Sequence, residues 1–273
     1  MFQKLIEENK IYIDFPEQKL SGRIKFSYDN LPEKVEKLLD AGCSYGYGTK
    51  YFSEKSKETY GIDISEDHII IARNKYPNII FSCRTTEDTG FPSDFFDAIV
   101  FNDVLEHTKD KIKSLTELFR ILKNSGTIII STPNKGLFGF LDPYNYGYYL
   151  RKLFPFIYKF LYKFIRLFKE GKIPDDYNPE HLEKHYHYSL NDLIEMLDSS
   201  DFKGNYEIKK VFRSGLFIEV FTMNLEVFLS IFFKKKLRDK FLKPFVWLSE
   251  QDYKVPYGIF SYNIAIVLVK KNQ

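Results

Sequence analysis

Residues 38–48 read Leu-Leu-Asp-Ala-Gly-Cys-Ser-Tyr-Gly-Tyr-Gly. An apolar run ends in an acid, and three glycines follow within seven residues. Two explanations are open at this point: a tight turn with no other role, or a strand that brings a loop without bulky side chains to a nucleotide-like ligand. Glycine suits the second role because it lets backbone N–H groups approach a ligand where a Cβ atom would be in the way.

Apolar runs alternate with helical segments on the C-terminal side of this glycine loop. We predict strands at residues 35–40, 59–63, 78–83, 96–102 and 127–131, and helices at residues 49–57, 66–75 and 110–122. Strands that alternate with helices over about 100 residues predict an α/β fold, with a parallel sheet and crossover helices. In such a sheet, ligands bind beyond the carboxyl ends of the strands. Asp63 ends the second predicted strand and is placed to accept hydrogen bonds from ribose hydroxyls.

The pattern changes after residue 134, where Tyr, Phe, Leu and Lys become dominant. A helix at residues 189–198 and a last core strand at residues 261–269 follow later in the chain. We therefore predict a single domain over residues 1–273. Its core would consist of residues 35–133, 186–220 and 258–270, and helical lid insertions would occupy about residues 134–185 and 221–250.

Composition excludes several classes of protein. The chain has 273 residues and is 44% hydrophobic, which is enough for a substantial core. Its 40 basic and 37 acidic residues give a net charge of only +3, which argues against a dedicated nucleic-acid binder. Two cysteines, Cys43 and Cys83, make no disulfide framework and favour a reducing, cytoplasmic location. We see no signal peptide and no apolar stretch of about 18 residues that would predict a membrane span.

The glycine loop does not fit a dinucleotide-binding fingerprint. Its order is Gly42-x-x-x-Gly46-x-Gly48 rather than G-x-G-x-x-G. Four ordered motifs instead resemble those of class I S-adenosylmethionine-dependent methyltransferases. They are the loop itself, GIDIS at 61–65, TTEDTGFPSDFFDAIVFNDVLEH at 85–107 and LKNSGTIIISTPN at 122–134. This resemblance covers about residues 35–135. It implies a Rossmann-like fold with a mostly parallel seven-stranded sheet, helices on both faces, and helical insertions after the fifth strand and before the last.

The resemblance also implies a site for S-adenosylmethionine, whose product would be S-adenosylhomocysteine. Gly42 and its neighbours would hold the methionine portion, Asp63 the ribose, and Ile64 would pack on adenine. The implied cofactor-binding residues are Asp40, Gly42, Cys43, Ser44, Tyr45, Gly46, Asp63, Ile64, Thr86, Glu87, Asp88, Asn102 and Asp103.

Two of these assignments depart from the family pattern. Ser44 stands in place of the middle glycine, and Thr85 stands where many members carry an acid that contacts adenine. Asp88, or backbone groups of Thr86 and Glu87, would then take the adenine role. Asn102 would approach the methionine ammonium through its carbonyl.

Three histidines are candidate catalytic residues. Methyl transfer from a sulfonium is an in-line displacement in which the protein mainly positions the acceptor. A hydroxyl acceptor needs a base, and histidine is the natural one. His107 follows the fourth strand, and His185 and His187 precede the helix at 189–198. Their alternative role is structural.

We predict no metal site in the cluster that His181 forms with these last two histidines. His181 and His185 share a face only in a helix, whereas His185 and His187 share one only in an extended segment. The segment also has no cysteine nearby that could serve as a further ligand.

Two aromatic and basic segments, residues 148–172 and 228–247, complete the pattern. In the first, Lys159, Lys163 and Arg166 fall within about 40° of Lys152 on a helical wheel. The helix is expected to start at Pro155. Residues 228–247 contain six basic residues and one acid. Such amphipathic helices favour peripheral membrane contact, and the alternative is a lid or a dimer contact.

Taken together, these features predict a methyltransferase that modifies an oxygen of a hydrophobic, lipid-linked or glycan-type acceptor. The STPN motif and the insertion after the fifth strand resemble the O-methyltransferases of ubiquinone biosynthesis and of glycan or lipid assembly. One alternative is a small-molecule or natural-product methyltransferase, and another is a non-catalytic cofactor-binding or interaction protein. A nucleic-acid methyltransferase is less favoured, because no D/N-P-P-Y-type motif is present.

Overall fold

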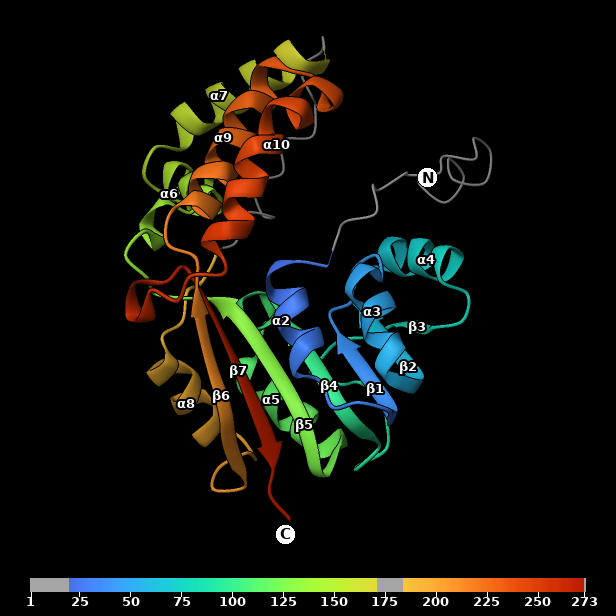
Figure 1. The fold of residues 1–273 in the computed structure, drawn as a ribbon. Helices are drawn as coiled ribbons and strands as arrows, with labels where there is room; N and C mark the ends of the chain where they lie inside the picture. Colours follow the sequence, from blue (N-terminus) through green and yellow to red (C-terminus); the bar gives the residue numbers. More distant parts are fainter. Residues whose placement is uncertain (1–19, 171–183, 273) are drawn as a thin grey trace. The chain divides into compact units, whose positions relative to one another are not determined.

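The computed structural model describes residues 20–170 and 184–272 (Figure 1). His181 therefore lies outside the described residues. The chain divides into two compact units. The first contains Met1–Ser131, Ile194–Val211 and Ala265–Gln273, and the second contains Thr132–Leu193 and Phe212–Ile264. The single domain expected from the sequence remains a prediction.

A seven-stranded sheet with the order β3-β2-β1-β4-β5-β7-β6 forms the centre of the fold. The strands are β1 (Val35–Ala41), β2 (Ser56–Asp63), β3 (Ile80–Cys83), β4 (Phe96–Asn102), β5 (Leu122–Pro133), β6 (Tyr206–Ser214) and β7 (Asn263–Lys270). The pairs β1–β2, β1–β4, β2–β3 and β4–β5 are parallel, whereas β6 and β7 run in opposite directions (Figure 1). The Rossmann-like arrangement is confirmed, but the sheet is mixed rather than purely parallel.

Burial explains why the central strands read as continuous apolar runs. Leu38, Leu39 and Ile99 are fully buried, as is most of β5 and β7. Strands covered on both faces show no polar alternation. The edge strand β6 alternates between half-buried and exposed residues over its first half. Its weak apolar signal explains why it is absent from the strands predicted individually.

Helices and short turns connect the strands. They are α2 (Gly22–Asn30), α3 (Tyr47–Phe52), η1 (Ser53–Lys55), α4 (Glu66–Lys75), η2 (Leu105–His107), α5 (Lys111–Ile121) and α8 (Leu190–Asp198). Helix α4 begins as predicted because Ser65 caps it, its Oγ accepting the His68 N–H. Asp110 caps α5 in the same way by accepting the N–H of Lys113.

The helix predicted at residues 49–57 is wrong in its second half, and β2 begins earlier than expected. Residues 53–55 form η1, and Ser56, Lys57 and Glu58 belong to β2. These three polar residues carry no apolar strand pattern. Pairing with β1, in which Ser56 lies opposite Val35, makes them a strand.

In the described part of the second unit, four helices pack together: α6 (Pro143–Leu153), α7 (Pro155–Glu170), α9 (Ile218–Phe232) and α10 (Lys235–Asp252). Two short turns, η3 (Gly139–Leu141) and η5 (Gly258–Phe260), flank them. As expected, α7 starts at Pro155. The carboxylate of Asp252 accepts the N–H groups of Leu216, Phe217 and Ile218 and so joins the end of α10 to the start of α9. None of the described helices is both long and apolar enough to cross a membrane.

Candidate functional site

The glycine loop after β1 depends on backbone conformations that favour glycine. Gly42 has φ +89°, and a Cβ atom added to it would lie 2.1 Å from Cγ2 of Val104. Gly46 has φ +73°, and its Cβ would lie 2.6 Å from the Phe81 ring. Ser44, which replaces the family's middle glycine, also adopts a positive φ of 47°. The substitution therefore keeps the left-handed backbone that a glycine would adopt with less strain.

Replacing Gly42 with alanine should destabilise the first unit by about 2–4 kcal/mol, because it adds backbone strain and a steric clash. The Val104→Ala exchange should recover the steric part in the double variant and leave about 1–2 kcal/mol of strain. Urea denaturation of the four proteins measures both contributions. Purely additive effects of the two substitutions would contradict the clash.

Asp63 ties the glycine loop to the start of α4. Its Oδ2 accepts the N–H of Ser44 at 2.9 Å, and its Oδ1 accepts the N–H of Ser65 at 2.9 Å. The side chain remains 14% exposed. Each carboxylate oxygen has a second lone pair, so both ribose hydroxyls could still be accepted. Ile64 follows directly and is 76% exposed, which leaves an apolar surface available to a planar base.

Asp40 and Cys43 are buried beneath this loop. Asp40 accepts the hydroxyl of Thr49 at 2.6 Å. Burial raises the pKa of Asp40 to about 7, against the lowering effect of Thr49 and with a contribution from the charge of Asp63. A cation bound beside it would favour the ionised form.

Cys43 packs with Ile69 and Phe81 in the core. Burial raises the pKa of its thiol, so the side chain stays uncharged. Its N–H and that of Gly42 both donate to the carbonyl of Ile62. Neither of these N–H groups is therefore aimed at a ligand. Cys43 and Cys83 are both free thiols, as predicted.

In the loop predicted to contact adenine, the side chains of Thr86 and Glu87 form hydrogen bonds with other groups of the protein. Thr86 is buried, and its hydroxyl lies 3.0 Å from that of Ser114. Glu87 accepts the backbone N–H of Lys109 at 3.1 Å. Burial raises the pKa of Glu87, but hydrogen bonds from Thr85 and from backbone N–H groups outweigh this and lower it. Asp88 is exposed. Contacts with adenine from Thr86 and Glu87 are thus expected to involve their backbone groups.

Asn102 carries a buried polar group that a ligand could satisfy. Its Oδ1 accepts the hydroxyl of Ser27 at 3.0 Å, whereas its Nδ2 is buried without a hydrogen-bond partner among the described residues. Such a donor is costly unless a ligand or water satisfies it. The neighbouring Asp103 has φ +55° and forms a 2.7 Å ion pair with Arg23.

Sequence reasoning missed three residues of this site: Arg23, Ser27 and His68. The first two lie on α2, a helix of mixed polarity with no apolar periodicity to reveal it. His68 lies on α4, with its Nδ1 3.5 Å from Asp63 and its ring centroid 4.3 Å from that of Tyr45. His68 follows Asp63 by five residues, and that spacing alone carries no recognised signal.

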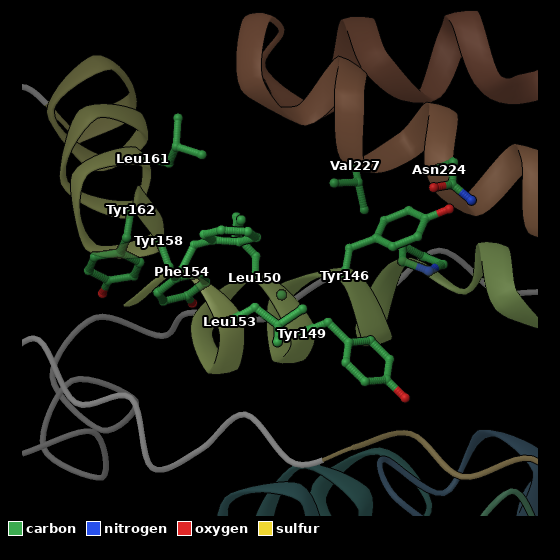
Figure 2. Close-up of a pocket in the computed structure, with 12 residues that line it drawn as sticks. Tyr146, Tyr149, Leu150, Leu153, Phe154, Tyr158, Leu161, Tyr162, Asn224 and Val227 are labelled. Carbon is green, nitrogen blue, oxygen red and sulfur yellow. The ribbon is translucent and has the colours of Figure 1, made fainter. Parts of the chain in front are cut away.

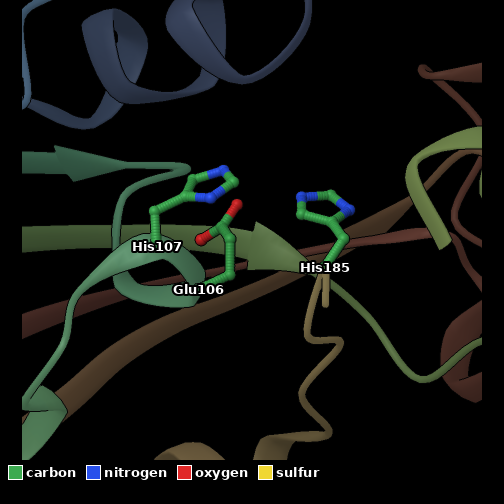
Figure 3. Close-up of side chains that lie close together, drawn as sticks. All are labelled: Glu106, His107 and His185. Carbon is green, nitrogen blue, oxygen red and sulfur yellow. The ribbon is translucent and has the colours of Figure 1, made fainter. Parts of the chain in front are cut away.

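His107 lies on η2, after β4, beside the buried Glu106 (Figure 3). His107 is exposed. Its backbone N–H donates to the carbonyl of Val104 at 2.8 Å. His185, also drawn in Figure 3, belongs to the second unit.

The second unit contains a compact histidine–carboxylate cluster. Oδ2 of the fully buried Asp142 contacts His185 Nδ1 and lies 2.8 Å from His187 Nε2. The hydroxyl of Tyr262 donates to the same oxygen at 3.3 Å. His187 Nδ1 also lies 3.1 Å from the carbonyl of Asn134. Three groups on one oxygen hold both imidazole rings in defined orientations.

His185 and His187 are two residues apart in a non-helical segment. In an extended chain, residues with this spacing point to the same side, so both rings can reach one carboxylate. The ligand atoms of Asp142, His185 and His187 all lie within 4.8 Å of one another, a spacing at which a metal ion could be held. The expectation of no metal remains a prediction.

An aromatic cavity of about 740 Å³ lies among the helices of the second unit (Figure 2). Ten of its twelve lining residues are aromatic or aliphatic side chains or proline, and Asn224 and Gly147 are the others. The lining consists of Pro143, Tyr146, Gly147, Tyr149, Leu150, Leu153, Phe154, Tyr158, Leu161, Tyr162, Asn224 and Val227.

The fold and the first unit's site define a Rossmann-like domain whose carboxylates suit a cationic nucleoside ligand. A family model described as a methyltransferase domain matches residues 39–130. A probable S-adenosylmethionine-dependent methyltransferase of Mycolicibacterium smegmatis is 30% identical over 98 residues, covering 36% of this chain and 38% of that protein. A ubiquinone biosynthesis O-methyltransferase of Coxiella burnetii is 26% identical over 137 residues, covering 49% of this chain and 58% of that protein.

Among solved structures, the YcgJ protein of Bacillus subtilis has a TM-score of 0.53 at 17% identity. The alignment covers 92% of this chain and 98% of that one, and it shows the fold alone. The matching segments span less than two thirds of both curated relatives. Over residues 39–130, the resemblance to class I S-adenosylmethionine-dependent methyltransferases is confirmed.

Proposed function

We propose that the whole chain is an S-adenosylmethionine-dependent methyltransferase that methylates an oxygen of a hydrophobic, lipid-linked acceptor. The observation that carries the activity is the arrangement around Asp63, within the matched residues 39–130. The aromatic cavity supports the acceptor class, because apolar cavities of this volume bind apolar ligands. The ubiquinone biosynthesis relative also bears a name that points to O-methylation.

The residues of the first unit would bind and orient the cofactor. When bound, S-adenosylmethionine supplies an electrophilic methyl group on sulfonium and leaves as S-adenosylhomocysteine. Asp63 would accept the ribose hydroxyls while its backbone contacts keep the carboxylate in place. Asn102 would donate its buried Nδ2 group to the ligand. Asp40 would lie near the cationic groups, which stabilise its ionised form.

His185 is our choice for the base that removes the acceptor's hydroxyl proton. Its Nδ1 contacts the buried Asp142, which directs Nε2 to the opposite edge of the ring. A carboxylate that orients a histidine also stabilises the imidazolium formed on proton transfer. In His187 both ring nitrogens face acceptors, the Asn134 carbonyl and Asp142. His187 therefore suits a positioning role better than proton removal.

The acceptor proposal is tested with a pair of substrates, an alkylated catechol with a long chain and catechol itself. Wild type should turn over the alkylated compound with the higher kcat/KM. Val227→Trp should lower that value at least ~10-fold by narrowing the cavity, with little effect on catechol. Val227 is 53% exposed, so the larger ring need not overpack the core.

The matched control is Val211→Trp on β6, outside the cavity lining, which should leave both values unchanged. Equal turnover of both substrates by wild type would favour the small-molecule alternative. Cofactor binding without turnover of any acceptor would favour the non-catalytic one.

A further inference from the structure

The helices of the second unit expose large apolar side chains that a water-facing surface does not require. On α7, Phe156 is 87% exposed and Phe160 is 68% exposed, and Phe164 continues the row. These three residues are spaced four apart, so they share one face of the helix. The rings of Phe160 and Phe164 stack with centroids 6.3 Å apart. A contiguous exposed aromatic row of this kind marks an interaction surface.

Lysines border this row. Lys159 and Lys163, also four residues apart, form the adjoining row of α7. An aromatic row beside a basic row is the pattern of a helix that lies in a membrane interface, with its rings at the acyl boundary and its ammonium groups at anionic headgroups.

Helix α10 also exposes apolar and basic side chains, which are interspersed rather than arranged in two separate rows. Its exposed apolar residues include Leu237, Phe241 and Trp247, and Lys240 and Lys243 are exposed along the same helix. Among the described residues, neither lysine has an acidic side chain within ion-pair distance. Residues 234–243, at the start of α10, hold six basic residues and one acid, in a chain whose net charge is only +3.

We infer that the exposed faces of α7 and α10 bind the surface of an anionic lipid bilayer. Charge decides between this occupant and a second copy of the chain. If two copies of the chain associated through these lysines, their positive charges would repel one another, whereas anionic headgroups would neutralise those charges.

Helix α7 also lines the aromatic cavity, together with α6 and α9. Leu161 on α7 and Val227 on α9 are partly exposed at its edge (Figure 2). If the proposed lipid acceptor is correct, a bilayer at this surface would let the acceptor's chain enter the cavity without crossing water. This last step rests on the proposed function, whereas bilayer binding does not.

Vesicle sedimentation of the full chain, without cofactor, tests the inference. Wild type should bind phosphatidylglycerol-containing vesicles at least ~10-fold more strongly than pure phosphatidylcholine, with a difference that shrinks as salt is added. Lys240→Glu/Lys243→Glu should lower binding to the anionic vesicles at least ~10-fold. Phe156→Ser/Phe160→Ser should lower it by on the order of 100-fold.

The matched control, Lys75→Glu/Lys113→Glu, makes the same change in net charge on exposed residues of the first unit and should retain binding. Light scattering after gel filtration reports the oligomeric state of each variant. Equal binding of wild type to both kinds of vesicle would overturn the inference, as would equal losses in the control. If wild type is a dimer that does not bind vesicles, and Phe156→Ser/Phe160→Ser is a monomer, the surface would instead bind a second copy of the chain. Calorimetry with S-adenosylmethionine in the absence of lipid tests the proposed function separately.

Discussion

Replacement of Asp63 by alanine should weaken S-adenosylmethionine binding by more than ~100-fold, or about 2.7 kcal/mol. Asp63 accepts two backbone N–H groups, from Ser44 and Ser65, and would also accept the ribose hydroxyls. The substitution therefore removes ligand contacts and releases the loop that positions the ligand. Hydrogen bonds to a charged group are each worth about 1.5–3 kcal/mol, so losing two accounts for the effect. Calorimetric titration with S-adenosylmethionine and S-adenosylhomocysteine measures it.

Asp67→Ala is the matched control. Asp67 is an exposed acid in the first turn of α4, so its loss makes the same change in charge near the same helix. Binding should be retained within about twofold, consistent with a screened surface charge. Thermal unfolding monitored by circular dichroism shows whether each variant remains folded. Unchanged affinity in a folded Asp63→Ala protein would contradict the site.

The second large effect concerns the base. His185→Ala should lower kcat by about 10²–10⁴-fold with little change in S-adenosylmethionine affinity, because general-base catalysis contributes that much. The acid limb of the pH–rate profile, where wild type loses activity as the base is protonated, should disappear. Steady-state kinetics across pH on the alkylated catechol measures both effects.

Asp142→Asn tests the positioning of this base. The exchange keeps the shape of the side chain but removes the charge that His185, His187 and Tyr262 share. We expect kcat to fall at least ~10-fold and the acid limb of the profile to move, which a purely structural role would not cause. Tyr186→Ala, at the 44% exposed residue between the two histidines, is the control and should keep the wild-type profile. A loss confined to His107→Ala would instead identify His107 as the base.

Much of the first unit could be predicted from local patterns. The runs at residues 35–40 and 96–102 match β1 and β4 to within one residue, because strands buried on both faces must be apolar throughout. The loop at Gly42 and Gly46 could also be predicted, because few residues other than glycine adopt its positive φ angles without strain. Asp63 followed from its position at the end of a predicted strand.

The contacts that these and other site residues make could not be found in this way. Ser27 and Asn102 are hydrogen-bonded although they are 75 residues apart, and Asp142 and His185 are 43 apart. The sequence pattern around Asp142 gives no sign that its side chain is fully buried and contacts two histidines. Likewise, the polar start of β2 becomes a strand only through its partner β1.

By itself, then, the sequence determined most elements of residues 35–135, the position of the glycine loop after β1 and the acid that ends β2. Periodicity and glycine positions encode these features locally. Only the tertiary structure decided that Arg23 pairs with Asp103, that the buried Asn102 Nδ2 has no partner within the described part of the chain and that Asp142 orients His185. These contacts form because burial removes water from polar groups, which then need partners from distant segments of the chain. A short stretch of sequence does not show which distant segment supplies the partner.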